Sequence, residues 1–135
     1  MDLRLLIPAR AIAMGPMRHA VRRFLQRARV PEDRGDLIVL AIDEACTNIC
    51  RHAYPEARPG LIRLHLRAGP RRLRVVIRDY GKPIPRRKLR GRRLDRPAPG
   101  GLGIHLMRAA FPGIRFEPCP RGTRLVLTAP AKVRT

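Results

Sequence analysis

A carboxylate and a carboxamide stand four residues apart at Glu44 and Asn48, within the stretch LAIDEACTNICRHAYP from Leu40 to Pro55. In a helix this spacing places both side chains on one face, one turn apart. The amide oxygen of Asn48 suits Mg²⁺, which takes few protein ligands and completes its shell with phosphate and water. Glu44 suits the orientation or deprotonation of a hydroxyl or water beside a terminal phosphate. Alone the pair is weak evidence, since both residues fit an exposed helix face equally well.

A second group of residues follows a β-rich segment in IRDYGKP, from Ile77 to Pro83. A carboxylate at a strand end, here Asp79, can accept a hydrogen bond from an exocyclic amine such as that of adenine. Gly81 lacks a Cβ and therefore allows the backbone to approach a flat base closely. By itself this Asp-x-Gly sequence is also typical of an ordinary turn.

The third group is the glycine-rich sequence PGGLGIHLM, from Pro99 to Met107. Gly101 and Gly103 stand where a helix is expected to begin, and a helix N-terminus with close backbone approach favours phosphate. The spacing fits neither a Walker motif nor the dinucleotide fingerprint, and a flexible loop before a helix is the simpler alternative. Thr123 opens the last strand, where its hydroxyl is placed to reach a base or a bridging water.

The elements that must position these residues are visible in the hydrophobic periodicity. Apolar residues at helical spacing predict helices over 16–30, over 31 to about 53, and over 100–111. Alternation predicts strands over 3–7, 61–67, 73–79 and 123–128, with a weaker one over 113–117. The segregated helices and strands favour a two-layer α/β sandwich with helices on one face of a mixed, mostly antiparallel sheet.

The chain of 135 residues suits a single domain, and we expect residues 1–135 to form one unit. Between the second glycine box and the strand before it, a proline- and arginine-rich stretch at about 82–98 predicts a basic lid. A merely solvated connection is the alternative.

The formal net charge is +20, from 30 basic and 10 acidic residues. Such a surface attracts nucleotides, acidic proteins or nucleic acid, although coding bias toward Arg explains it about as well. Only five aromatic residues occur, so stacking platforms for nucleic acid are scarce. We expect three reduced cysteines in a cytoplasmic protein without a membrane span. A metal site on Cys46, Cys50 and His52 lacks a second ligand pair.

Each group is weak alone, but the ordered set resembles the GHKL superfamily of histidine-kinase-like ATPase domains. Within it, the chain is most similar to bacterial anti-sigma-factor serine/threonine protein kinases. The resemblance covers about residues 14–128 and is carried by EACTNICRHAY, DYGKP and GGLGIHLM. The chain departs from the family at Ile84-Pro85, where relatives usually carry Phe-Asp, and in the arginine content of its lid.

The resemblance implies ATP and Mg²⁺ as cofactors and assigns a role to each box. Glu44 would be the catalytic base and Asn48 the Mg²⁺ ligand, while Asp79 would bind the adenine amino group. The remaining nucleotide contacts would come from Gly81, Gly101, Leu102, Gly103 and Thr123. His52 matches a frequent polar position that ends the helical box.

The function implied is phosphorylation of a Ser or Thr on an anti-anti-sigma (STAS-type) partner, coupled to control of a sigma factor and hence of transcription. We expect no direct contact with nucleic acid or membrane, and a homodimer is possible. The alternative is a switch of the same fold that binds nucleotide without transferring phosphate. A nucleic-acid binder that exploits the +20 charge is a third hypothesis.

Overall fold

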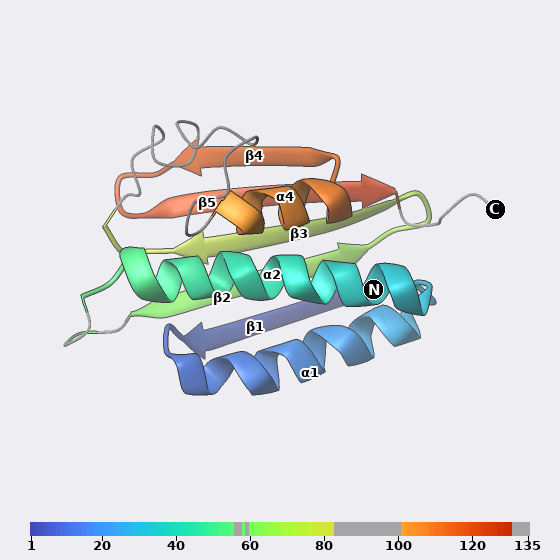
Figure 1. Cartoon of the computed structure of the whole chain (residues 1–135), viewed down its shortest axis with the longest axis horizontal. Helices are drawn as coiled ribbons and strands as arrows, with labels where there is room; N and C mark the ends of the chain where they lie inside the picture. Colours follow the sequence, from blue (N-terminus) through green and yellow to red (C-terminus); the bar gives the residue numbers. More distant parts are fainter. Residues whose placement is uncertain (56–57, 59, 83–100, 131–135) are drawn as a thin grey trace.

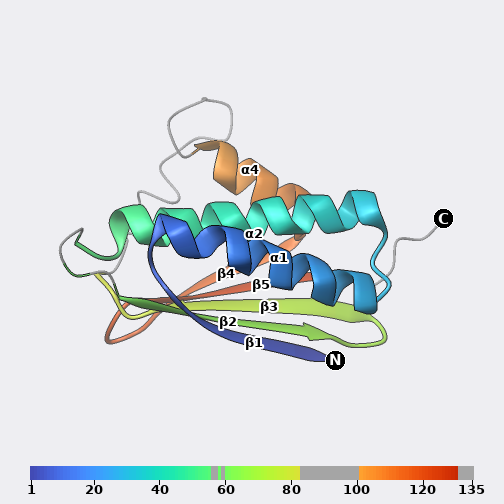
Figure 2. The same cartoon turned by 90° about the horizontal axis from the view of Figure 1, so that it is seen from below.

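The computed structural model describes residues 1–55, 58, 60–82 and 101–130, with side chains from residue 105 onward in the last range. The elements run in the order β1 (Asp2–Pro8), α1 (Ala11–Arg27), α2 (Glu32–His52), β2 (Leu61–Ala68), β3 (Arg72–Asp79), α4 (Gly101–Ala110), β4 (Gly113–Pro118) and β5 (Thr123–Pro130). The strands form one sheet in the order β1-β2-β3-β5-β4. Helices α1, α2 and α4 lie on one face of it (Figures 1 and 2).

The predicted two-layer fold is confirmed. The sheet was expected to be mostly antiparallel, and all four pairings of its described strands are antiparallel. Alternation along the strands explains the layering: in β2, Ile62, Leu64 and Leu66 are fully buried while Arg63 between them is exposed. Burying one such aliphatic side chain contributes roughly 1.5–3 kcal/mol, so the alternation fixes which face meets the helices.

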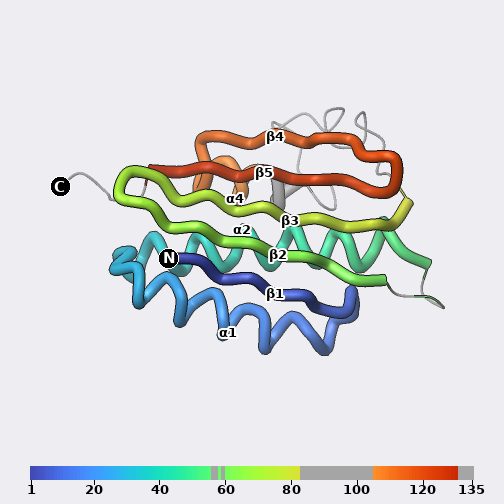
Figure 3. The backbone as a smooth tube through the Cα atoms, turned by 180° about the vertical axis from the view of Figure 1, so that it is seen from behind, coloured from blue at the N-terminus to red at the C-terminus, as the bar shows by residue number. Residues whose placement is uncertain are grey.

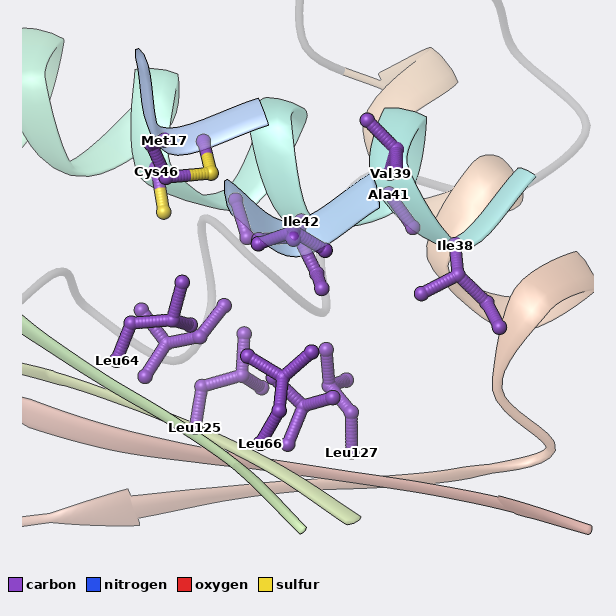
Figure 4. Packing of buried hydrophobic residues seen from close by; sticks show 14 of the residues in the cluster. Met17, Ile38, Val39, Ala41, Ile42, Cys46, Leu64, Leu66, Leu125 and Leu127 are labelled. Carbon is purple, nitrogen blue, oxygen red and sulfur yellow. The ribbon is translucent and has the colours of Figure 1, made fainter. Parts of the chain in front are cut away.

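The core lies between the sheet and α2, which runs between α1 and α4 (Figure 1). Ile38, Ile42 and Cys46 of α2 point toward Leu64 and Leu66 of β2 in Figure 4. In α2 the buried positions recur at helical spacing, and Glu32 and Asp33 put negative charge in its first turn, where the helix dipole favours it. This helix matches its predicted bounds to within one residue.

The first helix differs from the prediction at both ends. It begins at Ala11 rather than Pro16, so Pro16 lies inside the helix near its start. The helix accommodates this proline because the ring removes only one hydrogen bond and because Gly15 before it has no Cβ to clash with the ring. It ends at Arg27 rather than Val30. Arg29 adopts a left-handed φ of 60°, and the Val30 N–H donates to the Leu25 carbonyl, which closes the helix.

The remaining elements lie within one or two residues of their predicted bounds. The lid expected at about 82–98 falls outside the described residues, apart from Lys82 at its start. None of the described helices combines the length and the apolar character needed to cross a membrane.

Candidate functional site

A small pocket lies between the helical layer and the carboxyl end of β3. Its volume is about 40 Å³, and its lining combines three polar side chains with apolar ones. The polar residues are Asn48, Asp79 and Thr123, from α2, β3 and β5. The apolar walls are Ala45, Ile49, Ile77, Met107, Phe116 and Leu125. The structure thus brings together three of the residues predicted from separate motifs.

Asp79 is the most deeply buried of the three polar residues that line this pocket. Only 2% of the residue is exposed, and it is the one buried charged residue in the part of the chain that the structure describes. Burial raises the pKa of its carboxyl group, and the N–H of Gly81, which donates to Oδ1 at 3.1 Å, acts in the opposite direction. A buried carboxyl group of this kind favours a ligand that donates a hydrogen bond to it.

The turn after Asp79 is held against the end of α2 by hydrogen bonds. The Tyr54 hydroxyl donates to the Leu61 carbonyl and accepts the Tyr80 N–H, both at 2.7 Å. The Lys82 N–H donates to the carbonyl of Ala53 at 2.6 Å. These bonds fix the position of the Asp79 turn relative to the helix that carries Asn48.

The backbone around Asp79 leaves no room for side chains at two glycines. A Cβ on Gly81 would lie 2.1 Å from the Ala53 carbonyl oxygen. Gly122 has a φ of +78°, and a Cβ there would lie 2.2 Å from the Asp79 carbonyl oxygen. Gly81 was expected to approach a ligand, whereas the contact the structure shows for it is with the end of α2.

Glu44 and Asn48 are both half-buried on α2, but they have different surroundings. Asn48 borders the pocket, and Glu44 is not among the described residues that line it. One helical turn separates the two side chains by about 5–6 Å along and around the helix. Glu44 therefore lies toward the middle of α2, away from the Asp79 turn.

The second glycine box begins α4, as its sequence predicts. The helix starts at Gly101, with Leu102 and Gly103 in its first turn. At the end of α2, His52 is exposed, so its side chain points away from the core. Cys46, by contrast, is fully buried, and burial raises the pKa of its thiol. A metal site shared by Cys46 and His52 is therefore excluded by their opposite placement, and no cluster of metal-binding side chains occurs among the described residues.

Sequence reasoning did not identify Tyr54 or the apolar walls of the pocket. Ile77, Met107 and Leu125 have the spacing of core residues, which the pattern does detect. Their second role, as the wall of a cavity, depends on how far apart the layers sit beside Asp79. Nothing in the sequence around Tyr54 indicated its role, which follows from the structure: its ring is half-buried, and its hydroxyl therefore needs a hydrogen-bond partner.

A larger groove, of about 1020 Å³, lies on the other side of α2 near the start of α1. Its lining includes Arg10, Met14, Arg18, Thr47 and Tyr54, and none of the polar residues of the small pocket. Arg18 there forms an ion pair with Asp43 at 3.0 Å. The volume of a pocket alone therefore does not identify the candidate site. The buried carboxylate of Asp79 identifies it as the smaller pocket.

Comparison with known proteins agrees with this fold. The chain belongs to the histidine kinase-like ATPase domain family, which it matches over residues 7–129. It is 25% identical over 119 residues to the serine-protein kinase RsbW of Bacillus subtilis, covering 82% of this chain and 74% of that protein. It is 33% identical over 96 residues to the serine/threonine-protein kinase BtrW of Bordetella bronchiseptica, covering 68% of each.

Solved structures show the same fold at lower identity. The RsbU and RsbW domains of Rv1364c from Mycobacterium tuberculosis align with a TM-score of 0.69 and 21% identity, over 100% of this chain and 35% of that one. The histidine kinase domain of a blue-light-activated kinase from Erythrobacter litoralis aligns with a TM-score of 0.61 and 19% identity, over 93% of this chain and 62% of that one. The chain thus spans about a third of the first of these structures.

Proposed function

We propose that this protein binds Mg-ATP beside Asp79 and phosphorylates a Ser or Thr of an anti-anti-sigma (STAS-type) protein, thereby regulating a sigma factor. The observation that carries the proposal is the convergence of Asn48, Asp79 and Thr123 on one pocket. Membership of the ATPase family and similarity to proteins named as serine or serine/threonine kinases support the same activity.

Asp79 and Thr123 are suited to bind the adenine base. The carboxylate accepts a hydrogen bond from the exocyclic amine, the Thr hydroxyl can donate or accept, and the apolar walls cover the ring faces. The present volume of about 40 Å³ is far below the roughly 300–1,000 Å³ of ligand-binding pockets. Binding of a purine therefore requires wall side chains to move, and Met107, with its flexible thioether, is the most adaptable of them.

Asn48 and Glu44 are suited to the phosphate end. When bound, ATP supplies the γ-phosphoryl group and Mg²⁺ neutralises charge on its oxygens. Asn48 would offer its amide oxygen to the ion, while Glu44, one turn earlier on α2, would orient the partner's hydroxyl and accept its proton. The N-terminus of α4, with Gly101, Leu102 and Gly103, would face the phosphates.

The first test is calorimetry of ATP binding with and without Mg²⁺. We expect binding that tightens with Mg²⁺, and we expect Asn48→Ala to remove most of that metal dependence while leaving metal-free binding nearly unchanged. Thr47→Ala is the matched control, because Thr47 is on the same helix but lines the larger groove instead. Absence of any ATP binding by the unmodified protein contradicts the proposal.

The second test separates a kinase from a switch that binds nucleotide without transferring phosphate. The switch is the alternative because Glu44, the proposed base, does not line the pocket. We expect Glu44→Ala to retain ATP affinity within about twofold and to slow phosphate transfer to a STAS-type protein by ~10²–10⁴-fold. Glu32→Ala, in the exposed first turn of the same helix, should leave transfer unchanged. ATP binding without transfer by the unmodified protein would establish the switch.

A further inference from the structure

The sheet face opposite the helices, here called the open face, is strongly basic; Figure 3 views the molecule from that side. Strand alternation places on it the arginines of all five strands: Arg4, Arg63, Arg67, Arg72, Arg74, Arg78, Arg115 and Arg124. The acidic residues that the described strands contribute to this face are Asp2 and Glu117. These eight arginines and two acidic residues share a face of the sheet that none of the described helices covers.

Several of these arginines lie directly opposite one another. The register pairs Arg67 with Arg74, and it pairs Arg78 with both Arg63 and Arg124. Like charges at opposed positions destabilise a sheet. The arrangement therefore carries a cost to folding that an anionic partner on this face would offset.

The two acids of the open face do not neutralise it. Glu117 accepts from Arg115 at 2.8 Å and from Arg124 at 3.2 Å, and Asp2 contacts His65 at 2.8 Å. Neither Arg72 nor Arg74 forms an ion pair with any residue in the described part of the chain. Both are exposed, so their guanidinium groups are available to a carboxylate from outside.

A hollow of about 540 Å³ lies on this face at the end near Arg72 and Arg74. Arg67 and Arg115 complete its basic lining, with Val126 and Thr128 between them. The pocket beside Asp79 lies on the other face of the sheet, so this hollow is a separate feature.

The spacing of the charges selects the kind of partner. The Arg67–Arg74 row and the Arg63–Arg78 row are four residues apart along the strands, which is about 13 Å. Between the two rows, the half-buried Val76 has His65 on one side and the buried Val126 on the other. An α-helix with its side chains is about 10–12 Å wide and fits between such rows.

We propose that the open face binds an acidic helix of a partner protein, with carboxylates on its two flanks that meet the two rows of arginines. The match between the separation of the two arginine rows and the width of one helix assigns the occupant. A second copy of this chain would bring like charges together. The proposal does not rest on the proposed kinase activity.

The test uses a fluorescein-labelled 20-residue helical peptide of Glu, Leu and Ala, with its Gln-for-Glu counterpart as the uncharged probe. We expect the acidic peptide to bind and the Gln peptide not to bind, by fluorescence anisotropy at physiological salt. The double variant Arg72→Gln/Arg74→Gln should weaken binding by about tenfold, since charge-assisted hydrogen bonds are the strong ones. The matched control Arg23→Gln/Arg27→Gln, on exposed positions of α1, changes net charge equally and should weaken binding by less than about twofold.

Four outcomes overturn the proposal. Equal loss in both double variants means that only net charge attracts the peptide. Tighter binding of a 20-bp DNA duplex, or of phosphatidylserine vesicles, that is lost selectively in Arg72→Gln/Arg74→Gln assigns the face to nucleic acid or membrane instead. Self-association that the same variant abolishes, measured by sedimentation, assigns it to a second copy. No peptide binding by the unmodified protein removes the proposal altogether.

Discussion

The two faces of the sheet use the same strands for opposite purposes. On the covered face, residues such as Leu64 and Ile77 are fully buried, and the one charged residue that the described strands place there is Asp79, at a strand end. On the open face, their immediate neighbours Arg63 and Arg78 belong to a dense basic surface. Because successive residues point to opposite sides, a single strand serves a core and an exterior that have almost no chemistry in common.

The difference shows how position decides what a charge does. A carboxylate inside the pocket loses hydration, so its pKa rises and it needs a hydrogen-bonding partner. An exposed guanidinium keeps its hydration, and its interactions are screened by salt over about 10 Å at 0.1 M. Substitutions on the covered face should therefore change stability or nucleotide binding, whereas those on the open face should change association with partners.

The largest difference is expected between neighbouring residues of β2. Leu64→Ala should lower the free energy of unfolding by about 2–5 kcal/mol, because it leaves a cavity beneath α2. Arg63→Ala, one residue earlier and exposed, should change it by no more than about 0.5 kcal/mol. Urea denaturation followed by circular dichroism measures both. Similar losses for the two variants would mean that the open face is also part of a packed interior.

The next effect concerns the backbone around the pocket. Gly122→Ala should destabilise by about 2–3 kcal/mol, because the residue has a left-handed φ and its Cβ would meet the Asp79 carbonyl oxygen. Gly35→Ala is the control: its Cβ would have no neighbour closer than Leu25 at 4.0 Å, near the start of α2. There the same substitution should stabilise by about 0.5–1 kcal/mol. Thermal unfolding distinguishes the two signs directly, and a neutral Gly122→Ala would contradict the close contact.

The third prediction concerns binding rather than folding. Asp79→Asn should weaken ATP binding by about tenfold or more, since a lost partner in a buried site costs roughly 1–3 kcal/mol. GTP, which lacks the exocyclic amine at that position of the base, should bind equally weakly before and after the change. Calorimetry with both nucleotides provides the measurement. An equal loss for the two nucleotides would show that Asp79 supports the pocket without reading the base.

The same substitution has a consequence for pH dependence in the absence of nucleotide. The raised pKa of Asp79 means that the folded state holds its proton more tightly than the unfolded state, whose ordinary value is 3.8. The contribution of Asp79 to stability therefore declines as the pH rises from 3.8 through the folded-state pKa. Asp79→Asn removes this decline, so the stability of the parent relative to the variant should fall across that window. A constant difference from pH 3 to pH 7 would contradict the buried carboxylate.

Much of the fold could be predicted from the sequence because it depends on local periodicity. The long helix α2 and the strands with clean alternation lie within one or two residues of their predicted bounds. The predicted bounds of the first helix were wrong for two local reasons. Pro16 near its start was interpreted as the boundary, and Arg29, which is not a glycine, adopts the left-handed conformation that ends the helix. Backbone conformations of this kind have only a weak sequence signal.

The candidate site was predictable only in part, for a different reason. Asn48, Asp79 and Thr123 come from three distant segments, and their convergence follows from the sheet order rather than from any local pattern. The order places β5 beside β3, which brings Thr123 to the end of the strand that carries Asp79. The hydrogen bonds of the Tyr54 hydroxyl and the grouping of arginines on the open face likewise depend on strand pairing and register, which the sequence does not state.

The smallest effect tests the repulsion on the open face. Arg74 lies between Arg67 and Thr128 in the register, so Arg74→Glu replaces a like-charge pair by an opposite-charge pair. We expect a gain in the free energy of unfolding of roughly 0.2–1 kcal/mol at low salt. Arg74→Gln removes the repulsion without adding an attraction and should fall between the parent and Arg74→Glu.

Salt distinguishes this explanation from a packing effect. The three proteins should converge in stability at 1 M NaCl, where the screening length falls to about 3 Å, because the differences between them are electrostatic. A gain that persists at high salt would instead reflect better packing of the shorter side chain against Thr128. If Arg74→Glu is destabilising at low salt, Arg67 and Arg74 do not repel each other, and the argument that this face awaits an anionic partner loses its energetic basis.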